Sequence, residues 1–151
     1  MQKRVVCQNR KARHDYFIEE VYEAGIVLVG PEVKSLRQGR ASLKDAYARV
    51  KNEELFLYNM HISAYPFAHH VVIDSDRARK LLMHKSEIKR LIGKTEQKGY
   101  SLIPLSIYLL EGRFKVELAL AKGRKKYDKR HVLKEREMKR EMDRLKHNTG
   151  S

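Results

Sequence analysis

The chain has a single cysteine and no long apolar run among its 151 residues. One cysteine, Cys7, excludes an internal disulfide and any metal site built from cysteines alone. No apolar stretch approaches the roughly 18 residues that a membrane-spanning helix needs. The first residues, MQKRVVCQNRK, also lack the apolar core of a signal peptide. We therefore expect a cytoplasmic protein.

Short catalytic motifs are also missing. The sequence contains no GxxxxGK[ST], GxSxG, HExxH or CxxC. His69-His70 is its one adjacent histidine pair. Neighbouring residues project in different directions, and zinc would need two or more further ligands, so we expect no metal site there. The many carboxylates are explained by charged strand and loop faces. The sequence predicts no enzymatic activity, no catalytic residue and no cofactor.

Positive charge is abundant and unevenly spread. The chain has 33 Lys/Arg against 19 Asp/Glu, a formal net charge of +14. Residues 122–151 hold 12 basic and 5 acidic residues, and residues 1–121 hold 21 and 14, so each part carries +7. Such a field favours polyanions and salt-dependent binding. A membrane-surface helix would need an apolar face with aromatic residues, which 122–151 lack. A merely soluble basic protein stays an alternative.

The apolar pattern predicts a mainly β chain. Residues 1–13 read as an irregular basic lead-in, and Gly25 separates a first strand from a short apolar run at 25–30. Helical spacing appears over 31–39, where Pro31 suits a first turn, and within 79–94. A loop is expected at 63–76. Strands are expected at 16–22, 46–51, 54–62, 100–110 and 113–123, with tight turns at Asn52-Glu53 and Glu111-Gly112.

About six short antiparallel strands with two or three inserted helices favour a small closed or partly open barrel, because closure removes exposed strand edges. The change in composition sets a boundary at Lys122, so we expect a β-barrel domain at 1–121 and a basic tail at 122–151. In the tail, Met138, Met142 and Leu145 give only a thin helical stripe. A helix of this kind is marginal alone, so we expect the tail to be mostly disordered until it meets a partner.

Nucleic-acid binding has the best support among the functions considered. Hydrogen-bond donors and aromatic residues interleave over 9–16, which suits phosphate contact beside base stacking, although a solvated lead-in explains them equally well. Glu23 either accepts hydrogen bonds from a base edge or is simply solvated. In the tail, Tyr127-Asp128 interrupts a basic cluster, which charge alone would not require.

Four segments resemble the bacterial small protein B family, which binds transfer-messenger RNA: NRKARHDYFIEEVYEAGIVLVGPEVKSLRQGR (9–40), HISAY (61–65), RKLLMHKSEIKRLIG (79–93) and LAKGRKKYDKR (120–130). The resemblance implies an oligonucleotide-binding-type barrel that grips the transfer-RNA-like part of that RNA. It also implies trans-translation, the rescue of ribosomes stalled on messages without a stop codon. The tail would become helical in the empty messenger channel. The chain departs from the family pattern at Ala64-Tyr65-Pro66 and Asp74-Ser75-Asp76.

Carried over residue by residue, the resemblance implies RNA contacts from the body and a ribosomal role for the start of the tail. His14 would lie near the decoding centre, and the DKR motif would be needed for peptide transfer. We expect a monomer, with transfer-messenger RNA and the ribosome as partners. A generic basic ribosomal or single-strand RNA-binding barrel is the alternative. The RNA-binding candidates are Asn9, Arg13, His14, Tyr16, Glu23, Lys34, Arg37, Leu82 and Lys115; the tail candidates are Lys122, Gly123, Arg124, Lys125, Lys126, Tyr127, Asp128, Lys129 and Arg130.

Overall fold

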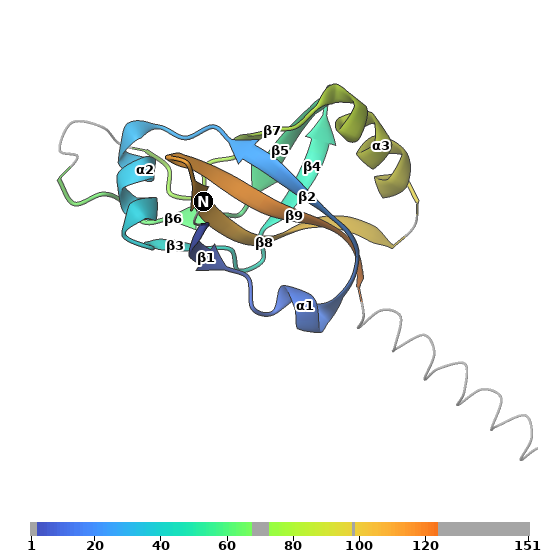
Figure 1. The fold of residues 1–151 in the computed structure, drawn as a ribbon, viewed down its shortest axis with the longest axis horizontal. Coiled ribbons are helices and arrows are strands. Elements are labelled where there is room, and N and C mark those ends of the chain that lie inside the picture. Colours follow the sequence, from blue (N-terminus) through green and yellow to red (C-terminus); the bar gives the residue numbers. More distant parts are fainter. Residues whose placement is uncertain (1–2, 68–72, 98, 124–151) are drawn as a thin grey trace, which may run out of the picture.

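A computed structural model describes residues 3–67, 73–97 and 99–123, which form nine strands and three helices (Figure 1). None of the helices in these ranges is long and apolar enough to cross a membrane. The strands are β1 (Arg4–Gln8), β2 (Tyr16–Ile26), β3 (Ala41–Ser42), β4 (Tyr47–Lys51), β5 (Glu54–Tyr58), β6 (His61–Ile62), β7 (Arg79–Leu82), β8 (Tyr100–Leu110) and β9 (Arg113–Gly123). The helices are α1 (Ala12–Asp15), α2 (Gly30–Arg37) and α3 (Lys85–Thr95).

Six strands close into a barrel. They pair antiparallel in the order β8-β4-β5-β7-β2-β9, and β9 returns to β8. This confirms the predicted mainly β, antiparallel barrel and shows that, of the closed and partly open forms expected, the closed one is present. Because β9 covers one edge of β8 along its whole length, β1 and β4 must share the other edge. β3 and β6 form a separate two-stranded ribbon.

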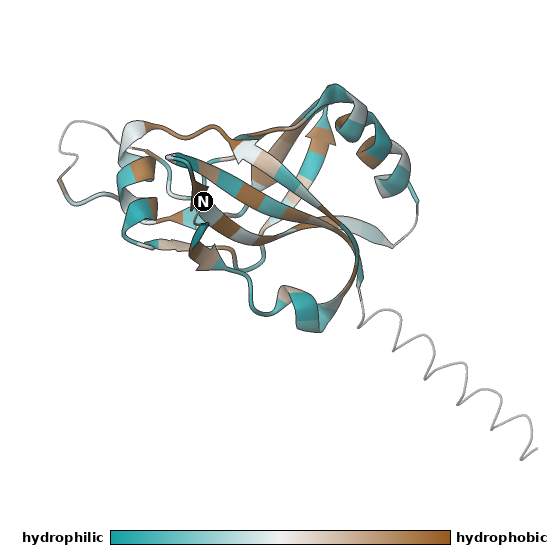
Figure 2. Cartoon of the chain, in the orientation of Figure 1, coloured by the Kyte–Doolittle hydropathy of each residue, from teal (hydrophilic) through white to brown (hydrophobic). Residues whose placement is uncertain are grey.

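Alternating side chains fill the barrel. Along β9, Val116, Leu118 and Leu120 are fully buried and point inward, and Figure 2 shows the resulting alternation of hydrophobic and hydrophilic bands. Both predicted tight turns are present. Asn52 and Glu53 have φ values of 52° and 63°, and Glu111 and Gly112 have 51° and 77°. Two successive positive φ values match the twist of a two-residue hairpin.

A smaller apolar cluster lies outside the barrel, beneath α1. Ala12 packs there against Ile103 and Leu105 of β8 and Ala119 and Ala121 of β9. The small alanine side chains of β9 let the helix approach the sheet closely. This contact fixes α1, and therefore Arg13 and His14, against the outer face of β8 and β9.

The structure corrects two local predictions. Residues 1–13 are not an irregular lead-in, because β1 pairs with the distant strand β8 and α1 follows it. Gly25 does not end β2, since it pairs with Leu82 on one side and Lys115 on the other. In both cases long-range pairing overrides the local signal. The helical spacing predicted within 79–94 is confirmed by α3, which begins at Lys85 after β7 ends.

The last barrel strand runs past the expected boundary at Lys122. Lys122 pairs with Phe17 and Tyr100, and Gly123 pairs with Tyr16. The hydrogen-bonded ladders on both sides continue after the composition has changed, and β9 spans the whole strand predicted at 113–123. The tail candidates from Arg124 to Arg130, and the expected behaviour of the tail, lie outside the described residues.

A buried ion pair ties α2 to the start of β7. Arg79 is fully buried and Glu32 is 3% exposed. The Arg79 guanidinium donates to Glu32 Oε2 at 2.7 Å, to Ser75 O at 3.1 Å and to Met60 O. Glu32 Oε1 also accepts from the Val29 backbone N–H at 3.0 Å. Every partner except Met60 lies in α2, at its start or in the segment leading to β7, so this cluster fixes their relative position.

Candidate nucleic-acid interface

Three of the predicted RNA-binding residues come together on the outer face of the barrel. Glu23 on β2 and Lys115 on β9 point outward, with 3.9 Å between Lys115 Nζ and Glu23 Oε1. Leu82 on β7 is 51% exposed and pairs with Gly25, the same residue that pairs with Lys115. A side chain at position 25 would place its Cβ 3.3 Å from Leu82 Cβ, so glycine allows this close packing. We call the surface around Glu23, Leu82 and Lys115 the β2–β9 face.

Glu117 extends this face and was not predicted. It lies directly opposite Glu23 across the β2–β9 pair. Its carboxylate is 3.4 Å from Arg13 Nη2 and 3.8 Å from Lys3 Nζ, and it accepts a hydrogen bond from Ser106 Oγ at 3.0 Å. The outward alternation of Lys115 and Glu117 was visible in the sequence. The proximity of Glu117 to Lys3 and Arg13 was not visible in the sequence, because both cations lie near the opposite end of the chain.

Tyr108 lies between the Glu23 carboxylate and the Lys3 ammonium. Burial raises the pKa of Tyr108, and a hydrogen bond with Glu23 raises this pKa further. The hydroxyl therefore stays protonated and able to donate at neutral pH. Lys3 Nζ lies 4.0 Å from the centre of the Tyr108 ring, within the range of a cation–π contact. The face thus presents cations and carboxylate acceptors, supported from below by the buried Tyr108 ring.

The linker from β1 to α1 and α1 itself carry the next candidates. Asn9 is partly structural: its backbone N–H donates to Leu105 O at 2.8 Å and its side-chain amide donates to Pro104 O at 3.0 Å. The His14 side chain is 86% exposed, with its Nδ1 3.3 Å from Asp15 Oδ1. An exposed imidazole at the end of a short helix is available for contact with a partner.

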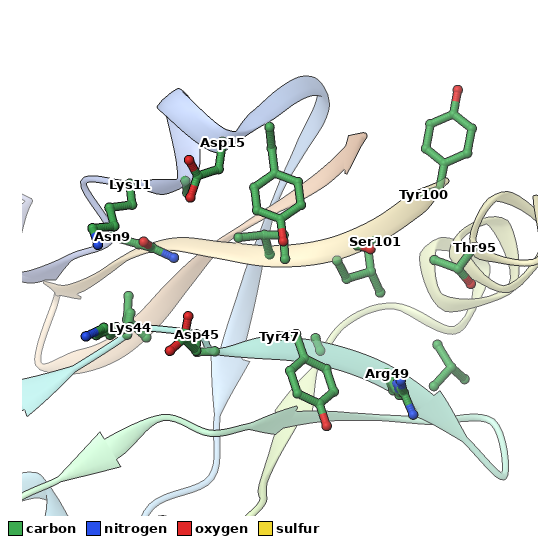
Figure 3. A pocket seen from close by; sticks show the side chains of 18 of the residues that line it. Asn9, Lys11, Asp15, Lys44, Asp45, Tyr47, Arg49, Thr95, Tyr100 and Ser101 are labelled. Atoms are coloured by element: carbon green, nitrogen blue, oxygen red, sulfur yellow. The ribbon is translucent and has the colours of Figure 1, made fainter. Parts of the chain in front are cut away.

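A groove of about 1050 Å³ opens beside this linker (Figure 3). It lies where β1 and β4 share one edge of β8 and leave the stretch between them uncovered. Tyr16, Tyr47 and Tyr100 line it together with Asn9. Tyr47 stacks on Tyr58 with ring centres 5.5 Å apart. Four basic and four acidic residues also line the groove: Arg10, Lys11, Lys44, Arg49, Asp15, Asp45, Glu53 and Glu96.

The remaining described candidates lie apart from the β2–β9 face. Lys34 and Arg37 are on α2, which packs against β1 and β6. The Lys34 ammonium lies 5.3 Å from the Tyr65 ring centre. Lys122 lies over Tyr100 at 4.7 Å, at the end of β9. None of these residues forms an ion pair or hydrogen bond with Glu23 among the described residues.

A closed antiparallel barrel with an outer face of cations and carboxylates, beside a groove lined by tyrosines, is typical of an oligonucleotide-binding-type barrel protein. The comparisons with known proteins narrow this class. The family model described as SmpB protein matches residues 6–148, and the chain therefore belongs to the SmpB family.

Individual relatives agree with this assignment. The chain is 63% identical over 139 residues to a Clostridium botulinum (strain Hall) protein named SsrA-binding protein, covering 92% of this chain and 89% of the relative. An SsrA-binding protein from Halothermothrix orenii is 59% identical over 141 residues, covering 93% and 91%. A solved structure described as "tmRNA-SmpB: a journey to the center of the bacterial ribosome" has a TM-score of 0.66 and 52% identity, covering 77% of this chain and 82% of that one.

Proposed function

We propose that this protein binds transfer-messenger RNA, also called SsrA RNA, and delivers it to stalled ribosomes. The observation that carries the proposal is the family membership, since relatives named SsrA-binding protein align with more than nine-tenths of the chain. The β2–β9 face supplies the matching chemistry. Its cations suit phosphates, and the exposed Glu23 carboxylate suits the N–H donors of a base edge.

In this proposal the protein is an adaptor and performs no catalysis. Its barrel binds the transfer-RNA-like domain of the RNA, and the ribosome carries out peptide transfer. His14 faces the decoding centre from α1. Lys122 and Gly123 end the barrel, and residues 124–151 enter the messenger channel, which is empty when the message has run out. A cationic segment suits that channel because ribosomal RNA lines it.

The function can be tested in a reconstituted translation reaction stalled on a message without a stop codon. With charged transfer-messenger RNA and its delivery factors present, we expect addition of this protein to start tagging of the nascent chain. Omission of the protein is the control. Tagging at the same rate with and without the protein would refute the proposal.

Substitution of Glu23 by alanine is expected to weaken binding to the transfer-RNA-like domain. The loss should be roughly 1–3 kcal/mol, the range for a polar partner left without its hydrogen bond. Gel-shift titration measures the change. Glu19→Ala is the matched control, since Glu19 lies on the same strand, β2, and belongs to no ion pair found within the described residues. Equal affinities for wild type and Glu23→Ala would count against the assigned contact.

A further inference from the structure

Glu117 places a second negative charge beside Glu23, next to the face proposed to contact RNA. Its side chain is 23% exposed and lies opposite a second carboxylate, Glu23, on the neighbouring strand. Like charges directly opposite in a sheet destabilise the pair. A carboxylate would also repel phosphate. Its presence on a protein of net charge +14 therefore calls for a specific role.

The contacts of Glu117 indicate that role. Its Oε1 is 3.4 Å from Arg13 Nη2, and its Oε2 is 3.8 Å from Lys3 Nζ. Ser106 Oγ donates to Oε2 at 3.0 Å, and Ser106 is buried, so the carboxylate is itself held in place. The two cations come from separate elements, since Arg13 lies on α1 and Lys3 precedes β1. Glu117 is the shared partner that brings both over the sheet.

We propose that Glu117 is a positioning residue that holds Arg13 and Lys3 ready to contact RNA phosphates beside Glu23. This inference rests on the proposed function. The Arg13 and Lys3 side chains are 66% and 47% exposed, and long exposed side chains lose conformational entropy when RNA fixes them. An anchor that orders them beforehand removes part of that loss. Glu23 contacts the base edge, and the two cations contact phosphates next to it.

The proposal predicts a change in RNA affinity opposite in sign to the change that net charge alone would cause. Removing one negative charge from a basic protein should tighten RNA binding if only the overall field matters. Loss of the Glu117 carboxylate as an anchor for Arg13 and Lys3 should instead weaken RNA binding. We expect Glu117→Gln to weaken binding of the transfer-RNA-like domain about fivefold to tenfold, the scale of one ordinary net hydrogen bond. The isosteric amide retains an acceptor for Ser106, so the fold is expected to persist.

The test compares full-length variants by titration at several salt concentrations. Glu19→Gln is the control, because it also removes one negative charge, but from β2 and without affecting Lys3 or Arg13. The RNA affinity of this variant should be unchanged or slightly higher. For Glu117→Gln, the slope of log affinity against log salt should become shallower. The number of phosphate contacts inferred from that slope should fall by about one to two. In a background of Lys3→Ala with Arg13→Ala, Glu117→Gln should cause no further loss.

Two results would overturn the inference. One is affinity of Glu117→Gln equal to or above wild type. The other is a full loss that persists when Lys3 and Arg13 are already alanine, which would mean that Glu117 acts without them. Either result leaves the proposed function intact as long as the wild-type protein still prefers transfer-messenger RNA to elongator transfer RNA. Failure of that preference would refute the proposed function itself.

Discussion

Truncation after Gly123 is expected to abolish tagging on stalled ribosomes while leaving binding to transfer-messenger RNA largely intact. The cut removes 11 basic and 5 acidic residues and spares every described barrel strand, because β9 ends at Gly123. The β2–β9 face keeps Glu23, Leu82 and Lys115. Only the non-specific electrostatic part of the affinity should fall, most visibly at low salt.

The physical reason is a division of labour between the two parts of the chain. The folded barrel recognises a folded RNA through fixed side chains. Residues 124–151 carry a net charge of +6 and few apolar residues, so we propose that they act only inside a ribosomal RNA channel. Gel shift and tagging of the nascent chain, measured with the same protein preparations, separate the two activities.

A full-length chain with Asp128, Lys129 and Arg130 replaced by alanine is the control for this truncation. It keeps the length of the tail and should also bind RNA normally but fail to tag. A truncated protein that still tags would contradict the role given to the tail. Loss of RNA binding in the truncated protein would contradict the role given to the barrel.

Replacement of Arg79 by methionine is expected to lower the free energy of unfolding by roughly 3–5 kcal/mol, the range for breaking a buried ion pair. Methionine fills much of the same volume, but it removes one of the two cations paired with the Glu32 carboxylate, the other being Arg77, and it leaves Met60 O and Ser75 O without their donor. Urea unfolding followed by circular dichroism measures the change. Lys80→Met is the matched control on the same strand.

Lys80 forms an exposed ion pair with Glu54 at 3.3 Å. Such pairs contribute at most about 1 kcal/mol. Equal losses for Arg79→Met and Lys80→Met would show that the buried cluster is not important for stability. A double change of Glu32 and Arg79 to apolar residues should be milder than Arg79→Met, because it leaves neither member of that pair as a lone buried charge.

The same cluster predicts acid sensitivity. Burial acts to raise the pKa of Glu32, but hydrogen bonds from Arg77, the Val29 N–H and Arg79 outweigh burial and lower it. A carboxyl with a lowered pKa in the folded state stabilises the fold above its ordinary pKa, and this stability is lost as the pH falls through the folded-state value. Urea unfolding below pH 4.5 should therefore show a steep decline in wild type and a weaker one in Arg79→Met. Parallel declines would contradict this.

The sequence predicted the barrel well because its longest strands carry strong local signals. The alternation of Val116, Leu118 and Leu120 and the turn at Glu111-Gly112 are both readable without a structure. β1 was missed because RVVCQ alternates poorly and becomes a strand only by pairing with β8, about 100 residues away. Arg79 and Glu32 were missed because single charged residues look exposed until their partners are known.

The candidate site was predicted less completely than the fold. Glu23, Leu82 and Lys115 came from the family resemblance, and the structure brings them together. Periodicity alone gave no reason to group them, since they lie on three different strands. Glu117 and Tyr108 escaped notice because their significance depends on contacts with Lys3, Arg13 and Glu23. A sequence shows residue types and their spacing along one chain. A binding face on a barrel combines residues from several strands, so the sequence does not show which of them are neighbours.

Competition between transfer-messenger RNA and elongator transfer RNA tests the central claim most directly. Full-length protein is bound to labelled transfer-messenger RNA at moderate salt, and either unlabelled RNA is added in increasing amounts. The account predicts displacement by transfer-messenger RNA near equimolar amounts, and by elongator transfer RNA only at large excess. Equal displacement by both RNAs would contradict it and favour a generic basic RNA-binding barrel.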